Sequence, residues 1–174
     1  MLSFSALFIT CGIILPIFFH SLGISGSIFL PMHIPVLLGG LILGWRAGLL
    51  IGFITPIISS FLTGMPPLFP ILPMMTIELA LYGAASGYTY QSLHWPLFVS
   101  LLFAMAIGRI GVAVMIAALA DSLHIQLSPL IYIIMSLSQG ALGVIIQLVF
   151  IPVFINRFNK IIYVKGVYKN NEKK

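Results

Sequence analysis

"FLTGMPPLFP", residues 61–70, separates two long apolar runs of the chain. The stretch is itself apolar, yet Gly64 and three prolines exclude a regular helix, because proline lacks a backbone donor and clashes with the preceding turn. Irregular apolar backbone is tolerated at membrane depth only where it packs against protein or lines a cavity. We therefore expect a rigid cap over a cavity that opens to the outside, with a simple interhelical turn as the alternative.

The composition around this stretch is that of an integral membrane protein. Of the 174 residues, 60% are hydrophobic and only 6% are charged, and the mean hydropathy is +1.18. Soluble domains carry about 25% charged residues, so this chain cannot build an ordinary water-facing surface. We expect one membrane domain over residues 1–158 and a basic cytoplasmic tail over residues 159–174. Because the lysines gather in that tail, the net charge of +5 indicates a membrane-proximal cluster and no nucleic-acid partner.

Six apolar runs are suited to cross the lipid bilayer, whose core of ~30 Å takes roughly 20 helical residues. They cover approximately residues 2–21, 30–44, 47–62, 71–90, 96–120 and 130–155. An even number of spans puts both termini on one side, and the lysine-rich tail places that side in the cytoplasm. The predicted fold class is an all-α membrane protein, a six-transmembrane-helix bundle with both termini cytoplasmic. The predicted location is the cell membrane, which the chain crosses several times.

Two ionisable side chains, Glu78 and Arg109, lie deep inside predicted spans and at similar depth on consecutive helices. A charge at the centre of a membrane costs on the order of 2.5–3.5 kcal/mol on insertion scales. Two interpretations follow and stay open. Glu78 and Arg109 form a structural ion pair, or they line a ligand cavity in which Arg109 meets an anionic or carbonyl group.

Other side chains are candidates for the same cavity. The substrate-binding candidates are His33, Met65, Phe69, Glu78, Tyr82, Arg109 and Gln139. His33 has an alternative as an interfacial residue, Tyr82 and Gln139 have one as contacts between helices, and Gln147 is interpreted only as such a contact. The histidines have no cysteine or acidic partner at ligand spacing, so we expect no metal and no cofactor. Without a catalytic triad, an HExxH motif or a Walker A motif, we expect no enzyme and no ATP hydrolysis by this chain.

The first apolar run offers a docking surface for another helix. Ala6 and Thr10 form a small-xxx-small pattern, which lets helix backbones approach closely in a membrane. We therefore predict that these two residues contact a partner protein.

Three blocks of the sequence resemble the substrate-binding S components of energy-coupling factor (ECF) vitamin transporters. They are "PMHIPVLLGGLILG" at 31–44, "SSFLTGMPP" at 59–67 and "ELALYG" at 78–83. The resemblance implies a subunit that binds a vitamin or vitamin precursor near the extracellular side and topples in the membrane to carry it inward. It also implies docking, through small residues of the first helix, on a transmembrane coupling subunit driven by two cytoplasmic ATPases. Thr10 stands where the family pattern has a second alanine.

The order of the blocks is closest to the pantothenate, cobalamin and hydroxymethylpyrimidine or pyridoxine subgroup. Pantothenate is preferred, because Arg109 suits its carboxylate. If Glu78 neutralises Arg109, an uncharged ligand such as a pyridine or pyrimidine alcohol or cobalamin fits instead. Two other functions stay open: a stand-alone proton-coupled carrier with Glu78 as the relay, and a structural membrane protein in which the two residues simply pair.

Overall fold

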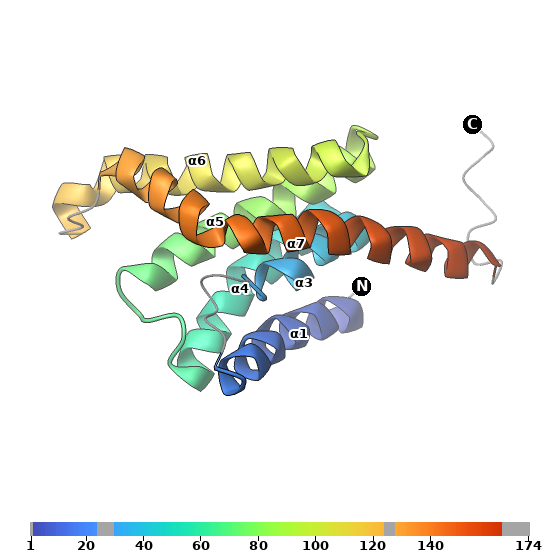
Figure 1. Cartoon of the computed structure of the whole chain (residues 1–174), viewed down its shortest axis with the longest axis horizontal. Coiled ribbons are helices and arrows are strands. Elements are labelled where there is room, and N and C mark those ends of the chain that lie inside the picture. Colours follow the sequence, from blue (N-terminus) through green and yellow to red (C-terminus); the bar gives the residue numbers. More distant parts are fainter. Residues whose placement is uncertain (1, 24–29, 124–127, 165–174) are drawn as a thin grey trace.

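The computed structural model describes residues 2–23, 30–123 and 128–164, and these residues form a helical bundle without strands (Figure 1). The elements are α1 (Leu2–Ser21), α3 (His33–Leu43), α4 (Trp45–Thr63), α5 (Ile71–Gly87), the π-helical turn η1 (Tyr88–Ser92), α6 (Leu97–Leu123) and α7 (Pro129–Val164). Each apolar run predicted from the sequence corresponds to one α-helix. The prediction of an all-α membrane protein is therefore confirmed at the level of fold class.

Within the described residues, four helices are long and apolar enough to cross a membrane: α1, α4, the Leu97–Ala118 part of α6 and the Gly140–Arg157 part of α7. The helices α3 and α5 are shorter, with 11 and 17 residues. The count of six spans and the side of the termini stay predictions. So does the domain boundary at residue 158, which falls inside α7.

Glycines bring α4 and α5 into backbone contact. A β-carbon on Gly48 would collide with the carbonyl group of Gly83, a β-carbon on Gly83 would collide with that of Gly48, and Gly52 faces the carbonyl group of Leu79 in the same way. Helices in a membrane associate through close packing because lipid tails are as apolar as their side chains. This glycine seam therefore fixes α5, the helix that carries Glu78, against α4.

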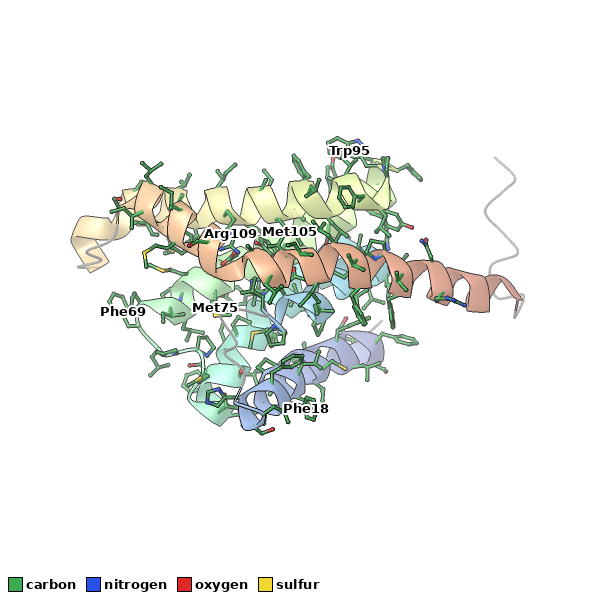
Figure 2. The ribbon with its side chains drawn as sticks, in the orientation of Figure 1. Phe18, Phe69, Met75, Trp95, Met105 and Arg109 are labelled. Carbon is green, nitrogen blue, oxygen red and sulfur yellow. The ribbon has the colours of Figure 1, made fainter. Side chains whose placement is uncertain are left out.

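Helix α1 buries little of its surface against the bundle. It lies against α3 and α4 (Figure 1), and Gly12 is its only buried residue. A β-carbon on Gly12 would stand 2.6 Å from the Thr55 methyl group of α4, so this glycine sets the closest approach. Phe18 is exposed and points away from the bundle (Figure 2). Most of the α1 surface is thus free for contacts outside the chain.

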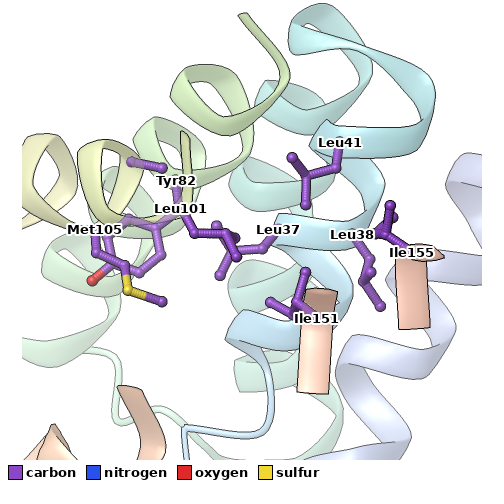
Figure 3. Packing of buried hydrophobic residues seen from close by; sticks show 9 residues of the cluster. Leu37, Leu38, Leu41, Tyr82, Leu101, Met105, Ile151 and Ile155 are labelled. Carbon is purple, nitrogen blue, oxygen red and sulfur yellow. The ribbon is translucent and has the colours of Figure 1, made fainter. Parts of the chain in front are cut away.

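The apolar core lies where α3, α6 and α7 meet (Figure 3). Its buried members are Leu37, Leu38, Leu41, Tyr82, Leu101, Ala104, Met105, Ile151 and Ile155. Tyr82 brings the only polar side-chain group of this cluster, a hydroxyl at the far end of its ring. The ring of Tyr82 therefore joins the apolar core to the polar residues described below.

Hydroxyl groups of α4 hold the Pro-rich loop that follows it. Gly64 ends α4 in the left-handed conformation with φ 74°, which glycine adopts without steric cost. Ser59 donates a hydrogen bond to the Met65 carbonyl oxygen at 2.8 Å, and Ser60 donates one to that of Pro66 at 2.6 Å. These bonds tie the start of the loop to α4, whereas the cavity expected beneath it stays a prediction.

Candidate functional site

Glu78 is the centre of a buried polar cluster. It lies on α5 with 5% of its surface exposed, and Arg109 of α6 is exposed by 8%. The Nε atom of Arg109 lies 3.1 Å from Oε1 of Glu78. The predicted proximity of these residues is confirmed, and they form an ion pair in which the two charges balance.

Two tyrosines complete the surroundings of the carboxylate. The Tyr82 hydroxyl donates to Oε1 at 3.0 Å, and the Tyr132 hydroxyl of α7 donates to Oε2 at 3.1 Å. Tyr82 follows Glu78 by four residues and so lies on the same helix face. Gly108 leaves room for its ring, because a β-carbon there would collide with it. The carboxylate thus has donors from α5, α6 and α7, as a buried charge requires.

His33 is buried at the start of α3 and contacts the same cluster. Its ring meets the Tyr82 ring edge-on, with centroids 5.3 Å apart and an interplanar angle of 67°. Among the residues that the structure describes, neither ring nitrogen of His33 has a hydrogen-bond partner. A buried polar group without a partner costs about 1–3 kcal/mol, so His33 has hydrogen-bonding capacity that the described protein groups do not use.

Arg109 has unused capacity of the same kind. Its Nη2 atom is buried and has no partner within the described part of the chain. This atom faces α7, where a β-carbon on Gly140 would stand 3.3 Å from it. The polar cluster, defined as His33, Glu78, Tyr82, Arg109 and Tyr132, therefore combines balanced charge with hydrogen-bonding atoms that no described group uses, and such a site can orient a polar small molecule.

The family model of the ECF transporter, substrate-specific component, matches residues 1–164. The chain belongs to this family. No curated protein and no solved structure matches the chain. Family membership makes this ECF component a membrane substrate-binding subunit for vitamin-type uptake, which works with other components of its transporter and is not an enzyme.

The structure of the ECF component brings together four of the seven predicted site residues. His33, Glu78, Tyr82 and Arg109 belong to the polar cluster. Met65 and Phe69 lie in the Pro-rich loop with about half of their surface exposed, and Figure 2 shows Phe69 well apart from Arg109. Gln139 precedes Gly140 on α7, but its side chain lies outside the described residues. The roles of Met65, Phe69 and Gln139 stay predictions.

Tyr132 is the cluster member that the sequence did not single out. It was one of several aromatic residues without a distinguishing feature. Helical spacing could have identified it. Tyr132 precedes Gly140 by eight residues and Gln147 by 15, and these spacings place all three near one face of a helix.

Away from the polar cluster, one surface groove of the ECF component is apolar and therefore poorly suited to a polar ligand. A groove on α7 is lined by Ile145, Ile146, Val149, Phe150 and Val153, all of them apolar. No group of three His, Cys, Asp or Glu side chains in the described ranges is placed to hold a metal ion. The polar cluster is therefore the best candidate for substrate binding.

The predicted docking residues lie on the free side of α1. Ala6 and Thr10 are both exposed, and the Thr10 hydroxyl donates to the Ala6 carbonyl oxygen at 2.8 Å. With its hydroxyl bonded to its own helix, Thr10 has no donor left to satisfy across an interface. This contact explains how a threonine can stand where the family pattern has an alanine.

Proposed function

We propose that this ECF component binds an uncharged vitamin or vitamin precursor for ATP-driven uptake across the cell membrane. The observation that carries the proposal is the buried Glu78–Arg109 pair together with nearby polar atoms that have no partner among the described residues, namely Nη2 of Arg109 and both ring nitrogens of His33. The pair supplies fixed polarity, and the unpartnered atoms supply hydrogen bonds for a ligand.

The charge balance decides which vitamin class is supported best. The preference for pantothenate assumed that Arg109 is free to meet a carboxylate. Because Glu78 already balances Arg109, a bound carboxylate would leave a net negative charge in a buried site, at a cost of several kcal/mol. An uncharged pyridine or pyrimidine alcohol, of the pyridoxine or hydroxymethylpyrimidine type, is therefore our first candidate. Pantothenate remains the second, because Nη2 of Arg109 is a donor suited to a carboxylate.

We propose that the chain crosses the cell membrane six times, with α3 and α5 as the short spans. Both termini then face the cytoplasm, with residues 1–158 in the membrane and residues 159–174 as the basic tail. The lysines of the tail support this orientation, because positive residues near membrane spans favour the cytoplasmic side.

The energy for uptake comes, in this proposal, from a transmembrane coupling subunit and two cytoplasmic ATPases. Ala6 and Thr10 on the free face of α1 form the contact with the coupling subunit. Their small side chains permit close approach of a second helix.

The two alternative functions are supported less well. A structural protein without ligand is expected to pair Glu78 with Arg109, and that pair is present. A purely structural role does not explain, however, why buried polar atoms lack partners among the described residues. Buried polar atoms without hydrogen-bond partners are rare in native structures. A proton-coupled carrier needs a carboxylate that can exchange its proton, whereas Glu78 is held by three donors from three helices.

Calorimetry and transport assays test the proposal together. Purified chain in lipid nanodiscs is titrated with pyridoxine, hydroxymethylpyrimidine and pantothenate, and uptake into vesicles is measured with and without the coupling subunit and ATPases. We expect binding of an uncharged compound, and uptake only with the complete transporter and ATP. Binding of pantothenate alone would refute the uncharged ligand, and uptake by the chain alone in a proton gradient would establish the carrier.

A further inference from the structure

A second polar position lies on the inner face of α7, at Gln147. Its side chain is fully buried. Its Nε2 atom lies 3.5 Å from the Leu30 carbonyl oxygen, the outer limit for a hydrogen bond, and Oε1 has no partner in the described part of the chain. Turning the amide over would leave its NH₂ group unpartnered instead. In either orientation Gln147 keeps an unused hydrogen-bonding group.

Leu30 lies between Gln147 and Arg109. Its carbonyl oxygen accepts a hydrogen bond from the His33 backbone at 3.1 Å and faces the Gln147 amide. Its side chain lies against Gly140, where a β-carbon would stand 3.0 Å from Leu30 Cδ1 and 3.3 Å from Arg109 Nη2. The φ angle of Leu30 is 48°, a left-handed conformation that is unfavourable for a residue with a β-carbon. An apolar side chain on strained backbone thus stands beside the residues that carry the unpartnered polar atoms.

The inner face of α7 changes character directly after Gln147. Ile151 and Ile155, one and two turns further on, belong to the apolar core with Leu37 and Leu38 (Figure 3). Gln147 is therefore the inner limit of the polar region. The helix rises about 10 Å from Gly140 to Gln147, and helical side chains lean back toward the N-terminus. Arg109 lies beside Gly140, so it and the Gln147 amide are separated along α7 by a distance that one substituted ring can span.

We propose that Gln147 is a specificity-determining residue, which binds the ligand edge opposite to the edge bound by Arg109. This inference rests on the proposed function, because it takes the polar cluster as the substrate site. The ligand is uncharged and ring-sized. It presents a hydrogen-bond acceptor to Nη2 of Arg109 and a hydroxyl or amino donor to Oε1 of Gln147, and it takes the place of the Leu30 side chain.

The first test is Gln147→Met, which removes the amide and keeps a side chain of similar length. Calorimetry in nanodiscs with pyridoxine and hydroxymethylpyrimidine is expected to show affinity for the better-bound compound lowered roughly 5- to 50-fold, the effect of one lost hydrogen bond in a buried site. The melting temperature is not expected to fall, because an apolar side chain replaces a partly unpartnered amide. A purely structural role predicts the reverse, a lower melting temperature with unchanged affinity.

Ser100→Ala is the matched control. Ser100 is also fully buried, and its hydroxyl has no partner among the described residues, but it precedes Arg109 by nine residues, or about 13 Å along α6. We expect this variant to bind both compounds as the parent protein does.

Leu30→Ala is the second test, and it does not depend on the folding of the Gln147 variant. Removing the side chain that the ligand replaces is expected to raise the affinity several-fold, because less structure must be displaced. A parent protein that binds neither compound would refute the proposed function, and this inference with it. If the parent protein binds a compound and both Gln147→Met and Leu30→Ala bind it with unchanged affinity, this inference is overturned while the proposed function stands. A lower melting temperature of Gln147→Met with unchanged affinity would overturn it in the same way.

Discussion

Arg109 contacts Glu78 through Nε, at 3.1 Å from Oε1, while its Nη2 atom lies close to Gly140 of α7, where a β-carbon would stand 3.3 Å from it. The guanidinium group joins α6 to α5 through an ion pair, and it keeps at Nη2 a donor that no group in the described part of the chain accepts. The structural and the ligand-binding interpretations of this pair are compatible for that reason.

The ion pair predicts unequal effects of its two single substitutions. Glu78→Gln leaves the Arg109 guanidinium buried without a counter-charge, at an expected cost of about 3–5 kcal/mol in unfolding free energy. Arg109→Gln is expected to cost less, because Glu78 keeps the hydroxyl groups of Tyr82 and Tyr132. The double variant is expected to recover part of the loss. Thermal melting in one detergent measures all three, and equal melting temperatures would show that the pair contributes nothing.

Tyr132 is predicted to stabilise the packing of α7 on α5. Tyr132→Phe removes the hydrogen bond to Oε2 of Glu78, and a bond to a charged group contributes about 1.5–3 kcal/mol. Tyr88→Phe is the control, because Tyr88 is half exposed at the end of α5. Denaturant titrations are expected to show a lower midpoint for Tyr132→Phe alone. The same midpoint for both variants would contradict a role for this hydroxyl.

The glycine seam predicts that one methyl group is enough to separate α4 from α5. Gly83→Ala places a β-carbon against the Gly48 backbone, which cannot move aside as a side chain does. We expect a loss at or above the upper end of the roughly 1–3 kcal/mol typical of overpacking. Ala106→Leu on the exposed face of α6 adds more volume and is expected to leave the melting temperature unchanged. Equal stability of Gly83→Ala and the parent would refute the seam.

The free face of α1 predicts a separation of transport from binding. Ala6→Leu or Thr10→Leu is expected to lower ATP-driven uptake severalfold, because a bulky side chain prevents close helix approach. Ligand affinity of the isolated chain is expected to persist, because both residues are exposed and outside the polar cluster. Uptake assays and calorimetry on the same preparations decide the matter. Parallel loss of both activities would assign the two residues to folding instead.

The membrane orientation predicts which added cysteines a membrane-impermeant thiol reagent reaches from outside. In a Cys11→Ser background, Met65→Cys on the Pro-rich loop is expected to react in intact cells. Lys173→Cys in the basic tail is expected to react only after the cells are opened. Labelling of Lys173→Cys in intact cells would contradict the six-span arrangement with cytoplasmic termini.

The sequence predicted the helices well because prolines, glycines and charged residues mark their ends. The run expected over 30–44 became α3 at His33–Leu43, and the run over 47–62 became α4 at Trp45–Thr63. Counting residues from the loops also placed Glu78 and Arg109 at one depth, which is why their proximity could be predicted.

The rest of the site depends on the rotation of each helix about its axis, which hydropathy does not determine. Tyr132 and Gln147 face inward because the glycines of α7 lie on the same side, and the sequence does not show which helix those glycines meet. The half-exposed side chains of Met65 and Phe69 depend on how the loop folds over α4. The bonds from Ser59 and Ser60 to the loop carbonyls show this arrangement, which hydropathy does not predict.

Backbone contact between Gly48 and Gly83 has a mechanical consequence. Helices that contact each other through long side chains can slide by changing rotamers. Where carbonyl groups and α-carbons are in direct contact, no side chain lies between the helices to adjust. Helices α4 and α5 are therefore expected to move as one rigid unit that carries Glu78. A conformational change that admits or releases a ligand is then expected in elements outside this unit, such as α1, α7 and the backbone at Leu30.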